Sequence, residues 1–491
     1  MGIPKFMGIE TEYNIYSSLT EGSTDQLINE MIGVLKGEQL GLDKRAVTPT
    51  RCFLKNGGLI YKDMSAPEYC TPECPDPQSL AIYDKAGEII VQKLAEKVSV
   101  LSECEIAIHK KSSDGHGNTS GCHENYSISP ELFKRLTANP VEDLIVRAWA
   151  TFLAVRQLIV GGGKIGSEIS GAPCPFQISQ RADFIVAFRN NTTVSDRPVI
   201  QCRDEALADQ KLVRRLHVVI GDANMCEWAI FLKGGLSALM LMALESDYFE
   251  ARKPPIFKAF VPKIIRSISR DIDLQENYET ESVNMPAISI LRHYLETLTE
   301  FLSNDRPTYL SEELALIYFD VLEKAQFVLS RLEAKDHTAL FGICDWTTKL
   351  MLAEKFSGKR SRNLQDCVSD SEFRLDLTSY IVMGYSSTDP AAGLYHALNK
   401  RGLIKRIATD EEIRLALENP PQGRATQRTA IIEKFNKNIE KIDWGKITIS
   451  NLSGEYTIEF PTPFGYINEQ VLKDELRRRG YATGTEKKEG I

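Results

Sequence analysis

Short runs in the first third of the chain alternate between apolar and polar residues. The runs at 7–16, 58–63 and 121–128 have a period of two, which is the period of a strand with one buried face. In the first run, Ile9 and Tyr13 lie on the apolar face. We therefore predict three strands, each with one apolar and one polar face.

Farther along, apolar residues recur every three or four positions, which predicts helices. These helices cover residues 84–97, 141–160 and 311–334. Ser311 precedes two glutamates and is expected to be the N-cap of the last of them. Thr409 and Glu412 have the spacing of a capping box, so another helix is expected to begin near Thr409.

The remaining segments suggest how the chain is divided. Residues 268–285 are polar and aperiodic and are predicted as a loop. After a Pro- and Gly-rich helix breaker, we expect a helix at 429–441, strands at 446–450 and 455–460, and a last helix. We predict one large domain over residues 1–404 and a small C-terminal domain over residues 405–491, with a frayed tail.

Composition places the chain among ordinary globular proteins. Of its 491 residues, 43% are hydrophobic and 26% are charged, which excludes a disordered, collagen-like or coiled-coil protein. The 59 Lys and Arg are outnumbered by 67 Asp and Glu, and the net charge of −8 argues against a general nucleic-acid binder.

The sequence also indicates in which compartment of the cell the protein is expected. The most apolar stretch, residues 228–244, is interrupted by Lys233 and two glycines, so its charge-free part is too short for the roughly 20 residues that span a bilayer. The chain starts without an apolar leader, and its ten cysteines show no paired spacing. We expect reduced thiols, a cytoplasmic location and no membrane association. The oligomeric state is left open, with a monomer favoured.

Carboxylates on the first predicted strand suggest a cation site. Glu10 and Glu12 are two residues apart, so their side chains project from one face about 7 Å apart. Two carboxylates on a half-buried surface repel each other unless a cation lies between them, and Mg²⁺ prefers such oxygen ligands. An isolated pair of this kind is more often a solvated strand face.

The second strand repeats this arrangement. Tyr61 and Asp63 share a face, and Glu68 follows after a short polar turn. Asp63 is a candidate general base, nucleophile or metal ligand, and Glu68 is a further candidate metal carboxylate. Taken alone, a strand that ends in a polar turn explains the same residues.

Histidine and arginine residues extend the candidate set. His123 and Asn125 share a face of the third predicted strand, and His217 opens another apolar run. A single histidine at a strand end is usually structural. A guanidinium fork suits phosphate oxygens, although an isolated arginine is more often a surface ion-pair partner. The candidates are Arg181, Arg203, Arg214 and Arg215.

Neither common nucleotide-binding loop is present. The chain has no P-loop sequence, and residues 161–166 match the pattern GxGxxG only in their letters. A dinucleotide-binding fingerprint requires a strand before the glycines and a helix after them. Here a helix is predicted before them and a polar loop after them, so we reject this interpretation.

Eight segments together resemble the Pup ligase and depupylase family, which acts on the prokaryotic ubiquitin-like modifier Pup. They keep the family's order along the chain and are residues 7–13, 54–74, 83–88, 121–126, 175–184, 214–224, 393–402 and 418–421. The resemblance implies a glutamine-synthetase-like α+β fold. A curved antiparallel sheet, packed with helices, holds ATP and Mg²⁺, and a small C-terminal α/β domain follows.

The resemblance also implies roles for the candidate residues. One magnesium shell would comprise Glu10, Tyr61 and Glu68. A second would comprise Glu12, His123 and His217. The expected nucleotide contacts are Arg181, Arg203, Arg214, Arg215 and Asn125. Asp63 matches the family's catalytic aspartate.

Two opposite activities share this fold. A ligase phosphorylates the C-terminal glutamate of the modifier and lets a substrate lysine attack, with Asp63 as the base. A depupylase hydrolyses the isopeptide bond, or deamidates a C-terminal glutamine, with Asp63 as nucleophile or water activator. A small-molecule glutamate–amine ligase and a non-catalytic modifier-binding protein are the remaining alternatives.

Sequence details favour the depupylase. Asp63 and Glu68 are five residues apart, whereas this interval is six in ligases, and segments such as residues 175–184 resemble depupylases more closely. Two features point the other way. Residues 17–53 are short for the loop that depupylases usually carry there, and Asn118 and Cys122 resemble ligase residues. We therefore expect a depupylase that acts on a Pup-like protein and its conjugates.

Overall fold

The structure is a computed structural model of the chain. It describes residues 2–18, 24–38, 50–138, 140, 142–168, 173–193, 196–205, 207–259, 261–360, 362–366, 370–435, 438–451, 454–465 and 478. The predicted last helix and tail fall almost entirely outside these residues.

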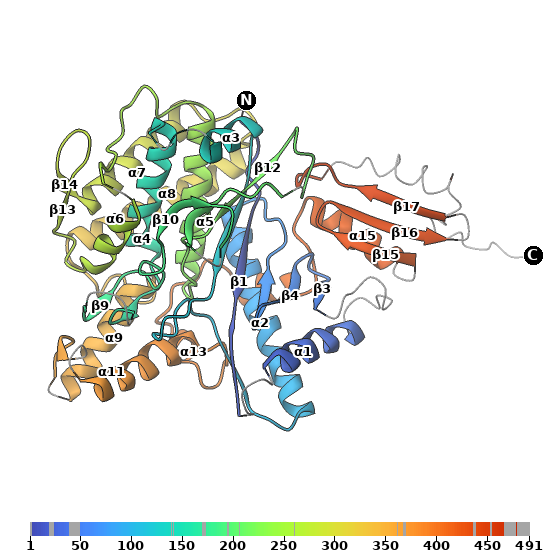
Figure 1. The fold of residues 1–491 in the computed structure, drawn as a ribbon, viewed down its shortest axis with the longest axis horizontal. Coiled ribbons are helices and arrows are strands. Elements are labelled where there is room, and N and C mark those ends of the chain that lie inside the picture. The colour runs from blue at the N-terminus through green and yellow to red at the C-terminus, as the bar shows by residue number, and fades with distance from the viewer. Residues whose placement is uncertain are drawn as a thin grey trace, which may run out of the picture.

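An eight-stranded sheet forms the centre of the molecule (Figure 1). Its strands, in spatial order, are β10 (Ala187–Asn190), β11 (Pro198–Gln201), β12 (Arg214–Val218), β7 (Cys122–Ile128), β1 (Met7–Glu12), β5 (Ala66–Cys70), β4 (Leu59–Asp63) and β3 (Arg51–Phe53). Every neighbouring pair is antiparallel except β10 and β11. The three predicted strands are confirmed, with the first run divided at Tyr13 into β1 and β2 (Asn14–Ser17).

Helices gather on one side of this sheet, on the left in Figure 1. The main apolar core includes residues of α2 (Pro77–Leu101), α4 (Leu144–Val160), α5 (Glu227–Glu245), α6 (Val261–Arg270), α7 (Ala287–Asn304) and α8 (Glu312–Glu333), together with residues of several shorter helices. Helix α5 is apolar and long enough to cross a membrane, yet 94% of its apolar 18-residue stretch is buried inside the protein. It is therefore a buried helix of the main apolar core.

Smaller elements connect these layers. Short strand pairs are formed by β2 with β6 (Ile106–His109), β8 (Lys164–Ile165) with β9 (Phe176–Gln177), and β13 (Asn277–Tyr278) with β14 (Met285–Pro286). Further helices before residue 424, among the described residues, are α1 (Thr24–Glu38), α3 (Pro130–Ala138), α9 (Asp345–Lys359), α11 (Ser371–Leu377), the π-helix η1 (Thr378–Met383), α12 (Gly384–Ser386), α13 (Leu394–Lys400) and α14 (Asp410–Ala416).

Most helix predictions are confirmed, with shifted ends. Ser311 accepts a hydrogen bond from the backbone N–H of Leu314 at the start of α8, and Thr409 and Glu412 form the expected capping box. Helix α2 begins earlier than predicted, after its N-cap Asp76. The predicted loop at 268–285 contains the end of α6 and the β13–β14 pair.

The helix predicted at 429–441 is wrong in its second half. Helix α15 covers Arg424–Phe435, and the strand β15 (Ile439–Asp443) follows. This strand pairs with β16 (Lys446–Asn451), which pairs with β17 (Gly454–Glu459). Short-range periodicity cannot separate a helix end from an adjacent strand when the strand is fixed by pairing partners farther along the chain.

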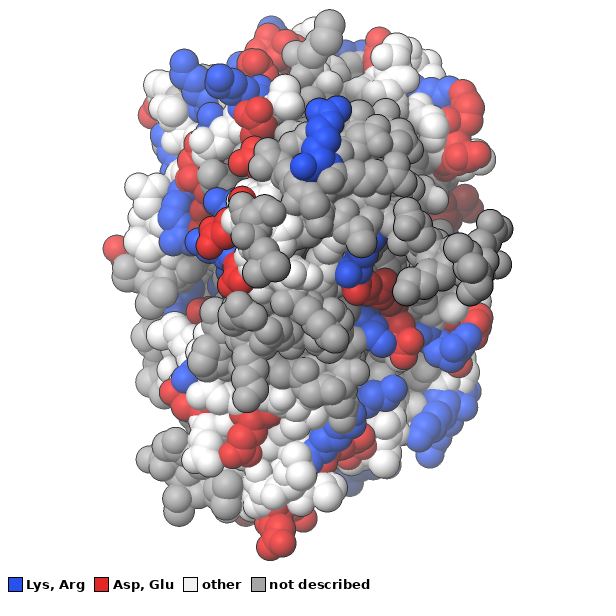
Figure 2. Space-filling view, turned by 90° about the vertical axis from the view of Figure 1, so that its right-hand side faces the viewer, with Lys and Arg blue, Asp and Glu red and all other residues white. Residues whose placement is uncertain are grey.

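The C-terminal sheet shares its core with the N-terminal half of the chain. Ile432 and Ile449 belong to the same apolar cluster as Ile28 and Phe53. The domain boundary at 404–405 stays a prediction. Among the described residues on the face that carries this sheet, acidic and basic side chains are interspersed (Figure 2).

A buried ion pair links α15 to the turn after β5. Arg428 is fully buried, and both its Nη atoms lie 2.9 Å from carboxylate oxygens of Glu73. Although burial alone would raise the pKa of Glu73, Arg428 and Arg424 lower it to about 2.

We expect Glu73→Gln to destabilise the protein by about 3 kcal/mol, because it leaves Arg428 buried without a counter-charge. In the wild type, the pKa of Glu73 lies below the ordinary value of 4.5, so its contribution is complete above pH 4.5 and is lost as the pH falls toward 2. Urea unfolding of the wild type and of Glu73→Gln at pH 7 and at pH 3 measures this difference in the free energy of unfolding. Glu411→Gln removes the exposed pair with Arg414 and should leave the midpoint unchanged. If Glu73→Gln lowered the free energy of unfolding equally at both pH values, the stabilisation would not come from the ionised carboxylate of Glu73.

Candidate functional site

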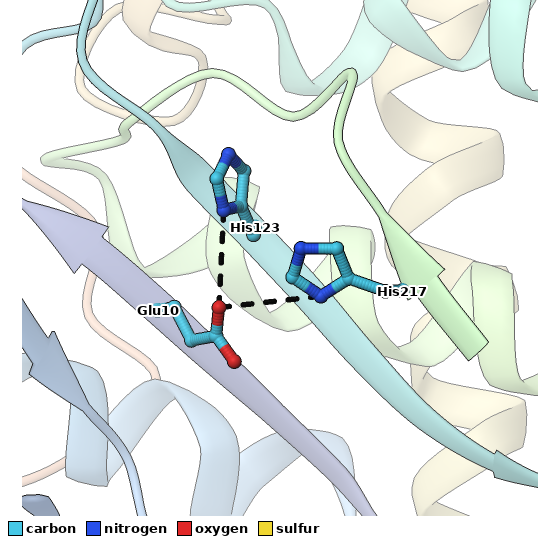
Figure 3. A group of neighbouring side chains, drawn as sticks. All are labelled: Glu10, His123 and His217. Carbon is cyan, nitrogen blue, oxygen red and sulfur yellow. Dashed lines mark ion pairs between the residues drawn. The ribbon is translucent and has the colours of Figure 1, made fainter. Parts of the chain in front are cut away.

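One group of potential metal ligands lies across β1, β7 and β12. Antiparallel register sets Glu10 opposite His123, and His217 opposite Asn125. In Figure 3 the carboxylate of Glu10 points toward both imidazole rings. Its Oε2 lies 3.8 Å from Nδ1 of His123 and 4.0 Å from Nδ1 of His217. The three side chains can therefore bind one ion together.

A second group lies beside the first, on β1, β5 and β4. It consists of Glu12, Glu68 and Asp63, and one carboxylate oxygen of each lies within 4.8 Å of those of the others. Register again explains the arrangement, because Glu12 is opposite Glu68 and Asp63 is opposite Ala66. Five of the candidate residues found from strand alternation, together with Glu68, are thus brought into two adjacent clusters.

The second cluster carries uncompensated negative charge. Glu68 is 1% exposed, and its Oε1 has no hydrogen-bond partner among the described residues. Burial, together with the charges of Glu10 and Glu12, raises the pKa of Glu68 well above its ordinary value. Burial and Glu12 likewise raise the pKa of Asp63.

The first cluster is electrostatically different. Burial and the neighbouring Arg215 lower the pKa of His217 well below its ordinary value, so its imidazole is neutral at pH 7. Burial alone would raise the pKa of Glu10, but His217, His123 and Arg215 bring it below the ordinary value. A neutral imidazole beside an ionised carboxylate is the ligand state that metal ions require.

The donor chemistry of both clusters fits divalent cations. Three oxygen ligands, one of them with an unpartnered buried atom, suit Mg²⁺, whereas two imidazoles and a carboxylate also suit Mn²⁺ or Zn²⁺. The grouping differs from the expected shells. Glu10 lies with the histidines and Glu12 lies with Glu68, while Tyr61 lies opposite Glu68 on the neighbouring strand.

Asn125 and Arg215 border the first cluster. Asn125 donates its side-chain Nδ2 to Glu10 at 3.0 Å, and Nη1 of Arg215 donates to Oδ1 of Asn125 at 2.6 Å. The same Nη1 lies 3.3 Å from Oε1 of Glu10. These two expected nucleotide contacts therefore lie directly beside the candidate metal ligand Glu10.

The other three arginines occupy different surroundings. Arg181 is buried, and its Nη1 donates to the backbone oxygen of Ser120 at 3.0 Å. The side chain of Arg203 is 61% exposed and pairs with Glu205. Arg214 pairs with Asp204, because strand alternation turns it away from Arg215 and Glu10.

A cavity opens from the first cluster toward the C-terminal sheet. Its polar lining includes Glu10, Asn125 and Arg215. Its apolar lining includes Phe6, Leu207, Trp444 and Pro463. An apolar slot that ends at arginine and metal-ligand side chains suits a flat base joined to a polyphosphate. Sequence reasoning missed the apolar residues, since no local pattern relates Trp444 to Phe6.

The chain is similar to known proteins over most of its length. Residues 5–448 match the family model described as Pup-ligase protein. A Pup deamidase/depupylase of Mycobacterium tuberculosis (strain H37Rv) is 32% identical over 425 residues, which cover 86% of this chain and 79% of the relative. A Pup–protein ligase of Acidimicrobium ferrooxidans is 31% identical over 488 residues, which cover 95% of this chain and 97% of the relative.

Two solved structures are also similar over nearly the whole chain. The complex of Pup with its ligase PafA matches with a TM-score of 0.80 and 28% identity, covering 97% of this chain and 92% of the matched chain. The Pup ligase PafA in complex with ADP matches with a TM-score of 0.74 and 27% identity, covering 94% and 95%.

Proposed function

This chain belongs to the Pup ligase family, and from that premise we propose that it is a depupylase. It is an ATP-dependent enzyme of the Pup ligase and depupylase family, and its partner is Pup or a Pup-like modifier. As a depupylase, it hydrolyses the isopeptide bond between the modifier and a substrate lysine, or deamidates the modifier's C-terminal glutamine.

The turn between β4 and β5 supports the hydrolase assignment. Asp63 pairs with Ala66 across a two-residue turn, in which Met64 adopts a φ of 48°. This tight turn accounts for the five-residue interval between Asp63 and Glu68 that resembles depupylases. A further residue in the turn, as in ligases, would displace Asp63 relative to the carboxylates of Glu12 and Glu68.

In this assignment the chain's own groups perform the proton transfers. The carboxylate of Asp63 either accepts a proton from the attacking water or attacks the amide carbon itself. If Asp63 acts as the base, the C–N bond breaks, the lysine nitrogen takes the proton that Asp63 removed from water, and the modifier leaves with a free carboxylate. If Asp63 acts as the nucleophile, the C–N bond breaks and the lysine nitrogen takes a proton from water. The remaining hydroxide then hydrolyses the anhydride, which restores Asp63 and frees the modifier's carboxylate. Glu12, Glu68 and the Glu10–His123–His217 cluster would hold Mg²⁺, which supplies Lewis-acid polarisation when bound.

The ligase is the second candidate, and coverage favours it. The Acidimicrobium ligase is matched over 97% of its length, whereas the M. tuberculosis depupylase is matched over 79%, and both solved relatives are ligases. In a ligase, Asp63 would deprotonate the lysine ammonium, because an ammonium has no free electron pair for attack.

Incubation of the full-length protein with Mg-ATP and a modifier–protein conjugate, followed by intact mass measurement, tests the proposal. A parallel reaction contains free modifier ending in glutamate and a lysine-containing protein. We expect free modifier to appear in the first reaction and no conjugate in the second. New conjugate in the second reaction, formed with matching ADP release, would replace the depupylase by the ligase.

A further inference from the structure

Asp222 follows β12 and is almost completely buried, at 3% exposure. Its Oδ2 accepts hydrogen bonds from the backbone N–H groups of Gly162 at 2.8 Å and Gln180 at 2.9 Å. Its Oδ1 accepts from the Ser179 hydroxyl and from the backbone N–H of Arg181, both at 3.0 Å. An ionised carboxylate offers about four acceptor sites, so this side chain is fully occupied by one loop and one glycine segment.

The Gln180 side chain fixes the same two segments from the other side. Its Nε2 donates to the backbone oxygens of Gly162 at 3.1 Å and Gly163 at 3.0 Å. Its Oε1 accepts from the backbone N–H of Ser112 at 2.7 Å. Asp222 and Gln180 therefore hold the triglycine segment 161–163 against residues 179–181.

Glycine is required for this close contact. A Cβ on Gly161 would lie 2.4 Å from the backbone oxygen of Ile178. Gly163 has a φ of +68°, and a Cβ there would lie 2.8 Å from Cα of Trp346. The glycines that superficially match a dinucleotide-binding loop thus have a packing role next to Arg181.

The Arg181 side chain extends from this support to the carboxylate cluster. It is 1% exposed, and its Nε has no hydrogen-bond partner among the described residues. Its Nη1 donates to the oxygen of Ser120, and the next residue, Gly121, donates its N–H to Oε2 of Glu12 at 2.7 Å. Arg181 is thereby connected to a candidate metal ligand through a single peptide unit.

We propose that Asp222 is a positioning residue for Arg181: it fixes the arginine backbone so that the guanidinium faces the terminal phosphate of a nucleoside triphosphate beside Glu12. The proposal rests on the proposed function, because it needs a nucleotide in this site. Asp222 itself touches neither nucleotide nor metal. Its effect on binding should therefore appear only through Arg181.

Calorimetry on the full-length protein with Mg²⁺, using ADP and a non-hydrolysable ATP analogue, tests this. We expect Arg181→Met to weaken the analogue about tenfold or more and ADP less than about twofold, because one charge-assisted contact is lost. Asp222→Asn places an amide N–H against backbone N–H groups. It should therefore weaken the binding of the analogue selectively, as Arg181→Met does. The double variant should be no weaker than Arg181→Met alone.

Asp271→Asn is the matched control. Asp271 is also a buried carboxylate that accepts two backbone N–H groups, those of Gln275 and Glu276, but it forms no hydrogen bond with residues 179–181. It should leave both affinities unchanged. If Asp222→Asn fails to fold, Gln180→Leu replaces it with the same expected loss.

The proposal would be overturned if the position-222 or position-180 variant weakened the binding of both nucleotides equally. It would also be overturned if the loss of analogue affinity multiplied with that of Arg181→Met in the double variant. The binding assay contains no modifier, so its failure is distinguishable from a failure of conjugate hydrolysis.

Discussion

Asp63→Asn is expected to slow release of the modifier from a conjugate by about 10³-fold, while nucleotide binding stays within about twofold. Asparagine has nearly the same shape as aspartate, but its amide can neither accept a proton from water nor attack an amide carbon. Burial and the nearby Glu12 already raise the pKa of Asp63, which makes its ionised carboxylate a stronger base than an exposed one. Single-turnover kinetics with Mg-ATP present measure the chemical step.

Asp25→Asn is the matched control for this substitution. Asp25 forms an ion pair at 2.6 Å with Lys62, the residue before Asp63, and its side chain is 53% exposed outside the carboxylate cluster. The control removes a carboxylate charge of α1 that pairs with the strand carrying Asp63, and it should keep the wild-type rate within about twofold. If the two variants lose activity equally, Asp63 acts through local structure and not as a reacting group.

Strand alternation could predict the carboxylate and histidine positions because they depend on a local rule. On a strand, residues two apart share a face whatever the partner strand is, so Glu10 and Glu12 had to lie together. The grouping of ligands depends on register instead. That Glu10 is opposite His123 and Glu12 is opposite Glu68 is fixed by pairing between segments far apart in sequence.

The arginines show where such local reasoning ends. Arg214 and Arg215 are adjacent and chemically identical, yet alternation on β12 gives only Arg215 access to Glu10. Arg203 is exposed, and no local signal separates it from the buried Arg181. Trp444 lines the cavity beside Glu10 because the C-terminal sheet packs beside the central one, which no periodicity reveals.

Family resemblance supplied what periodicity could not. The α+β, glutamine-synthetase-like fold is confirmed by the structural match to PafA over 97% of the chain. Helix α5 illustrates the difference between the two kinds of inference. The sequence shows only that Lys233 and two glycines interrupt its apolar run, whereas its burial in the main apolar core follows from the fold as a whole.

Mg²⁺ is expected to raise the unfolding temperature of the wild type, and Glu68→Gln is expected to abolish most of that rise. Without a cation, Glu12, Asp63 and Glu68 repel one another in a partly buried space, and Oε1 of Glu68 has no partner. An ion at about 100 times its Kd stabilises the folded state by about 2.7 kcal/mol. Thermal unfolding in EDTA and at a series of Mg²⁺ concentrations measures the unfolding temperature without and with the ion.

The order of stabilities should invert between the two conditions. In EDTA, Glu68→Gln should be more stable than the wild type, because it removes one of three repelling carboxylates at a buried position. With saturating Mg²⁺ the wild type should be the more stable, because glutamine is a weaker ligand for a hard cation. Glu250→Gln, which changes a half-exposed partner of Arg135, should show neither effect. A Glu68→Gln variant that is less stable than the wild type in both conditions would mean that Glu68 is held by packing and not by an ion.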